Sequence, residues 1–346
     1  MTAPSPLAAA LGVTRPVLAA PMAGGPSTPA LVTAAARAGG LGFLAAGYKT
    51  PQALADEIAA VAGASVPFGV SLFAPNPVPV SGPEFRAYAA AIGAEAARYG
   101  IRLADAVPVE DDDRWDDKID VLRGSPVPVV GFTFGIPGPD IIRALRRTGA
   151  LLVQTVTSAD EAKAAAEAGI DALAVQAAAA GGHSGTLTPR RPLAGTPLAG
   201  LIAAVRREVR LPVIAAGGIA TASDVSAAIR AGADAVAVGT LLLRADEAGT
   251  SATHRAALAD PARTGTVLTR AFTGRPARGL RNEFTDRYSG VAPYGYPALH
   301  YLTSPMRKAA AAAGDPERLH LWAGTGYRHA TAEPAAAILG RLAGQL

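Results

Sequence analysis

The sequence predicts an α/β fold: a closed TIM-type (β/α)8 barrel with a smaller cap domain formed largely by the C-terminal segment. Eight short apolar runs recur along residues 16–240, separated by Ala-rich stretches with helical spacing. Continuous apolar runs of this kind are typical of parallel strands that are covered on both faces. Five of the seven spacings between run starts lie between 22 and 27 residues, which suits one strand, one turn and one helix.

The apolar runs place the strands, and capping residues place two of the helices. The strands are expected over residues 16–21, 40–46, 67–73, 127–135, 150–156, 172–176, 212–218 and 235–240. Ser158, with Glu161 three residues later, predicts the start of one helix, and Thr221 with Asp224 predicts another. The long gaps after the third and sixth runs are expected to hold loop insertions.

The repeating pattern ends near residue 240, and the rest of the chain predicts two further segments. Residues 1–240 are expected to form the barrel, residues 241–305 a cap on the substrate side, and residues 306–346 helices that pack on the barrel. The stretches TRAFTGRPARGLRNEF (269–284) and YGYPALHY (294–301) are too polar or too irregular to extend a barrel.

Composition excludes several classes of protein. The chain of 346 residues has no cysteine, which rules out disulfides, thiolate metal sites and cysteine nucleophiles. The net charge is only +4 and no basic block is present, so no nucleic-acid partner is expected. The uncharged stretch 16–36 is interrupted by prolines and predicts no membrane span. We expect a soluble, cytoplasmic protein, with the acidic run EDDDRWDD (110–117) as a surface loop.

Two glycine-containing pairs follow the last two predicted strands. Gly217 and Gly218 follow the seventh run, and Gly239 and Thr240 end the eighth. In barrels of this type, the loops after strands seven and eight commonly bind phosphate through backbone N–H groups. Each pair alone could be a plain strand-to-helix turn, but both together predict a phosphate site.

The segment after the sixth run carries the strongest candidate for acid–base chemistry. His183 stands within the glycine-rich stretch 181–185, where the backbone is free and no apolar face buries the ring. Gln176 ends the sixth run and either contacts the edge of a planar ring or satisfies loop backbone. His254 is expected to face solvent, and His300 in the predicted cap could reach a substrate. No two histidines have the spacing of a metal motif, so no metal is expected.

Several segments resemble the nitronate monooxygenases, formerly called 2-nitropropane dioxygenases, in the class that keeps a histidine in an AGGH element. They are AAPMAGGPSTPALVTAAARAGGLGFLAAG (19–47), QAAAAGGHSG (176–185), AAGGIATASDVSAAIRAGADAVAVGT (215–240), FTGRPAR (272–278) and LWAGTG (321–326). The resemblance implies an FMN-dependent oxidoreductase with a cap over its barrel. It implies oxidation of alkyl nitronates, such as propionate 3-nitronate, by O2 through one-electron transfer to the flavin. The expected partners are a small nitronate or nitroalkane and O2, and a homodimer is one alternative for the assembly.

Carried over by position, the resemblance assigns roles to individual residues. His183 is the expected catalytic residue. The expected cofactor-binding residues are Ala20, Pro21, Met22, Ala23, Ser71, Gln176, Gly181, Gly182, Ala216, Gly217, Gly218, Val238, Gly239 and Thr240. The expected substrate-side residues are Thr133, Tyr296 and His300.

Five positions depart from the family pattern, and the alternatives to the expected activity stay open. Ser71 replaces an Asn, Thr133 replaces a His, and His300 replaces a cap Asn. Ala179 and Ser184 replace an acidic and a basic neighbour of the AGGH element. One alternative is an NAD(P)H-dependent FMN reductase of quinones or enoyl thioesters. The others are a flavin-binding protein without turnover and a sugar-phosphate barrel without flavin.

Overall fold

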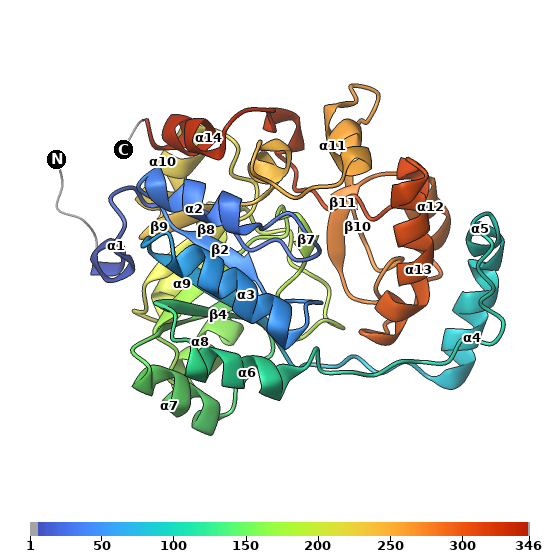
Figure 1. The fold of residues 1–346 in the computed structure, drawn as a ribbon, viewed down its shortest axis with the longest axis horizontal. Helices are drawn as coiled ribbons and strands as arrows, with labels where there is room; N and C mark the ends of the chain where they lie inside the picture. The colour runs from blue at the N-terminus through green and yellow to red at the C-terminus, as the bar shows by residue number, and fades with distance from the viewer. Residues whose placement is uncertain (1–5, 345–346) are drawn as a thin grey trace.

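The structure is a computed structural model that describes residues 6–344, and its centre is a closed barrel of parallel strands (Figure 1). The barrel strands are β1 (Val17–Ala19), β2 (Gly42–Ala45), β3 (Phe68–Ala74), β4 (Val129–Phe134), β5 (Leu151–Val156), β6 (Ala172–Gln176), β8 (Val213–Ala216) and β9 (Ala235–Val238). Neighbours pair in chain order, and β9 returns to pair with β1 in a register that places Leu18 opposite Ala237. Seven of these strands lie within their predicted ranges and β3 extends one residue past its range, so the predicted fold class is confirmed.

Helices surround the barrel and cover its outer apolar surface. They are α2 (Pro29–Arg37), α3 (Pro51–Ala62), α6 (Trp115–Gly124), α7 (Pro139–Arg147), α8 (Ala159–Glu167), α9 (Leu198–Glu208), α10 (Ala222–Arg230) and α14 (Ala335–Ala343). Thr221 and Asp224 form the predicted capping box of α10. Ser158 caps α8 as predicted, whereas the Glu161 carboxylate accepts hydrogen bonds from Thr157 instead of the cap backbone.

Small clusters of apolar side chains fill the inside of the barrel. Helix α1 (Pro6–Leu11) contributes Leu7 and Leu11, which pack with Leu18 and Phe43 from the first two strands. The carboxyl ends of the strands therefore remain as the place where a ligand can enter, as in other barrels. No helix within residues 6–344 combines the length and apolar character needed to cross a membrane.

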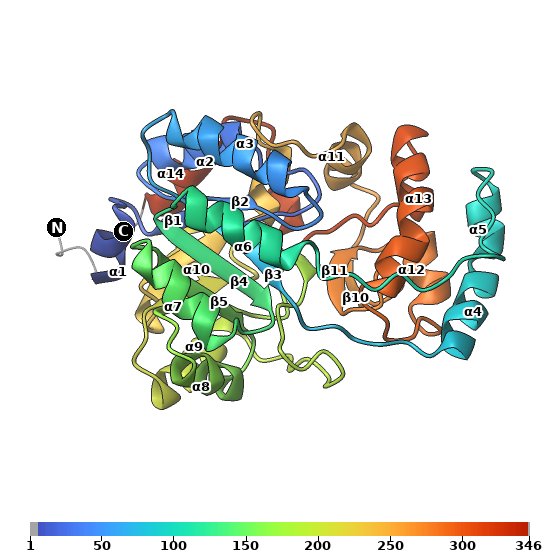
Figure 2. The ribbon, with the colours of Figure 1, turned by 60° about the horizontal axis from the view of Figure 1, so that its bottom comes forward.

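A second body of structure lies beside the barrel and is built from two parts of the chain (Figures 1 and 2). Helices α4 (Gly82–Ala91) and α5 (Gly93–Ala97) belong to the insertion between β3 and β4. From the tail come α11 (Ala252–Ala259), β10 (Thr266–Thr269), β11 (Ala277–Leu280), α12 (Glu283–Tyr288) and α13 (Ala298–Ala312). Phe85 and Tyr88 of α4 share one apolar cluster with Phe272, Phe284 and Leu299 of the tail. We call this second body the cap.

Short elements join the cap to the barrel. Strand β7 (Gly182–His183) follows β6 and pairs with β11, so that His183 lies opposite Ala277. Three 3-10 helices complete the path: η1 (Thr240–Arg244), η2 (Pro316–Arg318) and η3 (Tyr327–His329). Helix α13 runs across the predicted boundary between residues 305 and 306. The division into three segments therefore stays a prediction.

Candidate active site

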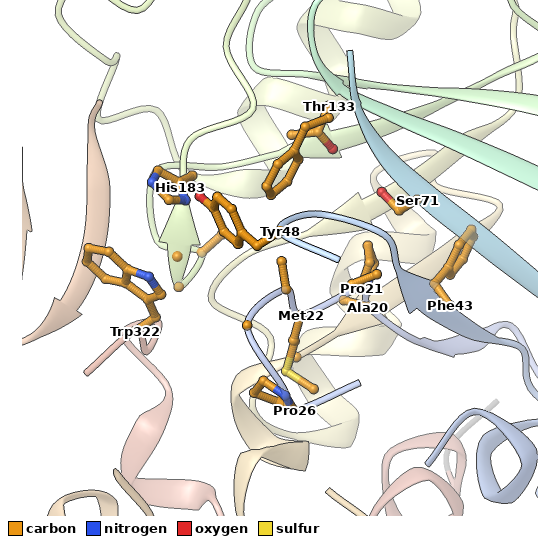
Figure 3. Close-up of a pocket in the computed structure, with 18 of the residues that line it drawn as sticks. Ala20, Pro21, Met22, Pro26, Phe43, Tyr48, Ser71, Thr133, His183 and Trp322 are labelled. Carbon is orange, nitrogen blue, oxygen red and sulfur yellow. The ribbon is translucent and has the colours of Figure 1, made fainter. Parts of the chain in front are cut away.

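A cavity of about 740 Å³ opens at the carboxyl ends of the barrel strands, between the barrel and the cap. Figure 3 shows His183, Tyr48 and Trp322 on one side of this cavity and Ser71 and Phe43 on the other. The structure brings together every residue that the sequence assigned to the site except Tyr296, which lies behind the cavity wall. The volume falls within the range of about 300 to 1,000 Å³ that is usual for small-molecule pockets.

One end of the cavity is formed by glycines after β8 and β9. Gly217 and Gly218 have φ angles of 104° and 80°, a left-handed backbone that side chains rarely adopt. A Cβ atom at Gly217 would lie 2.9 Å from the carbonyl oxygen of Ala177. The Thr240 Oγ1 accepts a hydrogen bond of 2.9 Å from the backbone N–H of Gly324. We call these loops, with Gly239, the glycine corner, and their backbone can approach a ligand closely.

His183 lines a separate part of the cavity wall, on the short strand β7, and we call this part the His183 end. Its Nε2 lies 2.9 Å from the Thr273 Oγ1. The rings of Phe134, Tyr296 and Trp322 surround it, with centroids 5.7, 5.7 and 5.5 Å away. Burial among these rings, together with the charges of Arg275 and Arg307, lowers the pKa of His183 to about 3. The imidazole is therefore neutral at pH 7 and can accept a proton.

Gln176 holds the loop that carries His183. Its Nε2 donates a hydrogen bond of 3.1 Å to the carbonyl oxygen of His183, and its Oε1 accepts one of 2.8 Å from the N–H of Gly185. These bonds match the alternative in which Gln176 satisfies loop backbone. Because Gln176 also lines the cavity, the same amide that orients His183 lies beside any bound ligand.

The predicted substrate-side residues differ in their access to the cavity. Thr133 lines it, and its Oγ1 lies 3.3 Å from the Oγ1 of Thr155. His300 lines it as well and stacks on the Tyr48 ring, with centroids 4.1 Å apart and an interplanar angle of 6°. Tyr296 acts from behind, because its hydroxyl lies 3.2 Å from the hydroxyl of Tyr48.

Two arginines without a carboxylate partner give the His183 end a positive charge. Arg275 is 0% exposed and donates to the carbonyl oxygens of Asn76 and Thr186. Arg307 is 5% exposed and contacts only neutral groups. Within residues 6–344, neither forms an ion pair with an acidic side chain. Burial lowers the pKa of each arginine to about 10, so both remain charged at neutral pH. A buried cation without a partner suits an anionic ligand.

The prediction that His254 faces solvent is wrong. His254 on α11 is 8% exposed and lines the same cavity. Helix α11 is polar in composition, but its Ala257 and Leu258 pack with Leu243 and Leu319 in an apolar cluster, and this packing buries the histidine. Burial lowers the pKa of His254 to about 4.

The prediction that residues 110–117 form a surface loop is only partly correct. Asp111 and Asp112 are exposed, but helix α6 begins at Trp115. Asp113 turns inward, where its Oδ1 accepts a hydrogen bond of 2.9 Å from the backbone N–H of Tyr48. Its Oδ2 lies 2.7 Å from the Nζ of buried Lys118.

Sequence reasoning missed Tyr48, Arg307 and Trp322. The second apolar run ends at residue 46, and Tyr48 follows it after a single glycine. Because active sites of barrels lie at the carboxyl ends of the strands, this position could have been recognised as a candidate. Arg307 lies within an ordinary helix and Trp322 within a loop, so neither carries a local signal. In the part of the chain that the structure describes, no group of three or more His, Cys, Asp or Glu could hold a metal ion.

Comparisons with known proteins agree with this geometry. Residues 5–343 match the family model described as nitronate monooxygenase. A probable nitronate monooxygenase of Staphylococcus aureus strain Newman is 37% identical over 342 residues, covering 97% of this chain and 95% of the relative. The structure of a nitroalkane oxidase from Streptomyces ansochromogenes matches with a TM-score of 0.92 and 44% identity, over 99% and 98% of the two chains. FabK from Thermotoga maritima matches with a TM-score of 0.76 and 26% identity, over 99% and 95%.

Proposed function

The chain belongs to the nitronate monooxygenase family, and on this premise we propose that it oxidises alkyl nitronates with O2 in an FMN-dependent reaction. Propionate 3-nitronate is the substrate that we propose to test first. The observation that carries the proposal is the pairing of a neutral His183 with two buried arginines that lack a carboxylate partner. That end of the cavity suits a small anion, and the nitronate group is a small anion.

The residues present fit a flavin mononucleotide. The glycine corner offers backbone N–H groups and the Thr240 hydroxyl, which are suitable donors for a phosphate. Ala20, Met22 and Gln176 line the cavity between the glycine corner and His183, where they would lie along a planar ring. Once bound, FMN would supply the electron-transfer chemistry that these side chains cannot perform.

The chain's own residues bind the substrate anion and handle a proton. The Thr273 hydroxyl lies 3.3 Å from the carbonyl oxygen of Arg275, which can only accept a hydrogen bond. With the hydroxyl hydrogen directed there, Nε2 of His183 is the donor to Thr273 and Nδ1 carries the lone pair. We propose that Nδ1 takes the α-proton when a nitroalkane enters, while the charges of Arg275 and Arg307 stabilise the resulting nitronate.

Oxygen uptake by the purified, flavin-loaded protein tests this function. We expect steady O2 consumption when propionate 3-nitronate is added. A yellow protein without O2 consumption would instead be a flavin-binding protein without turnover. A colourless protein that does not take up FMN would point to a sugar-phosphate barrel.

A reductase is the second candidate function, and the observation that favours it is the structural similarity to FabK. An NAD(P)H-dependent FMN reductase of quinones or enoyl thioesters takes electrons from a nicotinamide instead of a nitronate. Anaerobic mixing with NADPH separates the two. We expect the flavin absorbance to persist, and fast bleaching by NADPH would favour the reductase.

We also propose small-molecule partners and a cytoplasmic location. A cavity lined by glycines, rings and arginines suits a nitronate or nitroalkane together with O2. The absence of cysteine and therefore of disulfides fits a reducing compartment. The homodimer remains a prediction, for which size-exclusion chromatography with light scattering is the direct measurement.

A further inference from the structure

Arg307 on α13 is a buried cation whose N–H groups donate hydrogen bonds to neutral acceptors. Its Nε donates a hydrogen bond of 3.0 Å to the Thr303 Oγ1. Its Nη1 lies 3.2 Å from the Nε2 of His320. Its Nη2 lies 3.2 Å from the Nδ1 of His300 and 2.8 Å from the carbonyl oxygen of the same residue. Arg307 therefore contacts His300 at two atoms, Nδ1 and the carbonyl oxygen.

This contact fixes which nitrogen of His300 carries the hydrogen. A guanidinium group donates hydrogen bonds and cannot accept one, so Nδ1 of His300 must present a lone pair to Arg307. A neutral imidazole then carries its single hydrogen on Nε2. Burial, together with the charge of Arg307, lowers the pKa of His300 to about 2, so the neutral form is the relevant one.

The other edge of the His300 ring is available to a ligand. Nε2 has no hydrogen-bond partner within residues 6–344, and His300 lines the cavity. The ring is also held in position from its face, because it stacks on Tyr48. Tyr48 is in turn fixed by its hydroxyl contact with Tyr296 and by its backbone bond to Asp113. A donor held at one edge by Arg307 and on one face by Tyr48 needs little reorganisation when it meets an anion.

We propose that His300 is a substrate-binding residue whose Nε2–H donates a hydrogen bond to an anionic oxygen of the substrate, and that Arg307 is the positioning residue that fixes this tautomer. The two histidines then have complementary parts, because His183 presents a lone pair and His300 presents a hydrogen. The identity of the anion as a nitronate rests on the proposed function, whereas the tautomer and the anion contact do not. The acceptor oxygen belongs either to the nitronate group or to a carboxylate on the same molecule.

Nitrogen NMR of the flavin-loaded protein, labelled with 15N-histidine, tests the tautomer directly. The signals of His300 are assigned by their loss in the variant His300→Phe. We expect the wild type to show the Nε2–H tautomer, Arg307→Lys to keep it, and Arg307→Met to lose it in favour of a mixture. The lysine variant retains a donor toward Nδ1, so it also controls for damage to the fold. Unchanged Nε2–H signals in Arg307→Met would overturn the positioning role.

Titration with simple anions tests the binding role without any turnover. Nitrate serves as the probe for a planar N–O anion, and propionate serves as the probe for a carboxylate. A shift of the His300 Nε2–H signal by nitrate assigns the contact to the nitronate oxygen, and a shift by propionate assigns it to a carboxylate. If neither anion moves the signal, the proposal is wrong, whether or not the enzyme oxidises nitronates.

Kinetics of His300→Phe give an independent measurement. Phenylalanine keeps the stacking on Tyr48 but has no N–H, so we expect KM for propionate 3-nitronate to rise about tenfold with the flavin content unchanged. The control His329→Phe changes an exposed histidine outside the cavity and should leave KM as it is. An unchanged KM in His300→Phe would contradict the binding role. Absence of turnover in the wild type would instead contradict the proposed function and leave the NMR results standing.

Discussion

The two ends of the cavity are built by different means. The glycine corner consists of backbone from two neighbouring strand ends, β8 and β9, together with Gly324. The His183 end consists of side chains from segments far apart in the sequence, including Tyr48, Arg307 and Trp322. Backbone N–H groups can bind a phosphate whatever the side chains are, whereas a wall of side chains can be adapted to one substrate. This difference supports our proposal that the glycine corner binds the cofactor and the His183 end determines specificity.

Acid should destabilise the folded protein through its buried histidines, and this is the largest effect that we expect. His183, His254 and His300 have folded pKa values of about 3, 4 and 2, below the usual value near 6.5, because they are buried. Between about pH 6.5 and 4 the unfolded chain therefore binds more protons than the folded chain, and stability falls as the pH falls. Each such proton contributes about 1.4 kcal/mol per pH unit, so the total loss reaches several kcal/mol.

Asp113 has the opposite effect on the pH dependence of stability, because it reduces by one the number of extra protons that the unfolded chain binds. Burial raises its pKa to about 6, so between pH 4 and 6 the folded state holds a proton that the unfolded state has released. Chemical denaturation at a series of pH values measures the net slope. His254→Gln should remove about one proton from it, and the exposed His329→Gln should not. A pH-independent stability between 6.5 and 4 would show that these imidazoles are not neutral in the folded protein.

Replacement of His183 gives the largest expected effect on activity. With a nitroalkane as the substrate, His183→Asn removes the group that accepts the α-proton and should lower turnover by about 10²-fold or more. Flavin content should stay near the wild-type value, because the glycine corner at the other end of the cavity is unchanged. Oxygen uptake and the flavin absorbance spectrum measure the two quantities. Loss of both together would show that the two ends are not independent.

The pH dependence of the wild-type enzyme sharpens the same point. With the pKa of His183 held near 3 by burial, kcat/KM should show no break between about pH 6 and 8 from this residue. If kcat/KM instead changed with an apparent pKa near 6.5, and this change disappeared in His183→Asn, His183 would be far more solvated in the free enzyme.

Replacement of a glycine in the glycine corner should impair FMN binding and leave the fold intact. Gly218→Val adds a side chain at a φ of 80°, where the new Cβ would lie 3.1 Å from the Cβ of Ala179. We expect FMN affinity to fall by about tenfold or more, which equals about 1.4 kcal/mol, while the barrel stays folded. Flavin content and circular dichroism are the measurements.

The matched control is Gly138→Val, in the loop after β4, where a Cβ would meet no atom within 4 Å. It should keep its flavin. Full flavin retention in Gly218→Val would exclude the glycine corner as the phosphate site.

The fold was predictable because its signal is local. The range 172–176 matches β6 without any shift, six other strands fall inside their predicted ranges, and β3 ends one residue beyond its range, because each strand is an unbroken apolar run covered on both faces. The cap was harder to predict. Helices α4 and α5 belong to it through contacts such as Phe85 with Phe272, which join residues almost 200 positions apart.

The site divides in the same way. The glycine corner could be predicted from the sequence, since Gly217 and Gly239 each follow an apolar run directly. The part formed by rings and Arg307 could not, because Arg307 reaches the cavity only through the packing of α13 within the cap. His254 shows the limit most clearly. Its helix is polar in sequence, and only the packing of α11 buries the ring.

The smallest effect that we expect belongs to Tyr48, at the point where the barrel and the cap meet. Tyr48→Phe removes the hydroxyl that lies 3.2 Å from Tyr296 but keeps the ring on which His300 stacks. One neutral hydrogen bond contributes about 1 kcal/mol, so KM should rise by roughly two- to fivefold and kcat should change little. The control Tyr99→Phe removes the hydroxyl that lies 2.6 Å from Asp315, outside the cavity, and should affect stability but not KM. A 10²-fold loss of kcat in Tyr48→Phe would instead make this hydroxyl part of the chemistry, and substrate binding and catalysis would then extend across the junction between barrel and cap.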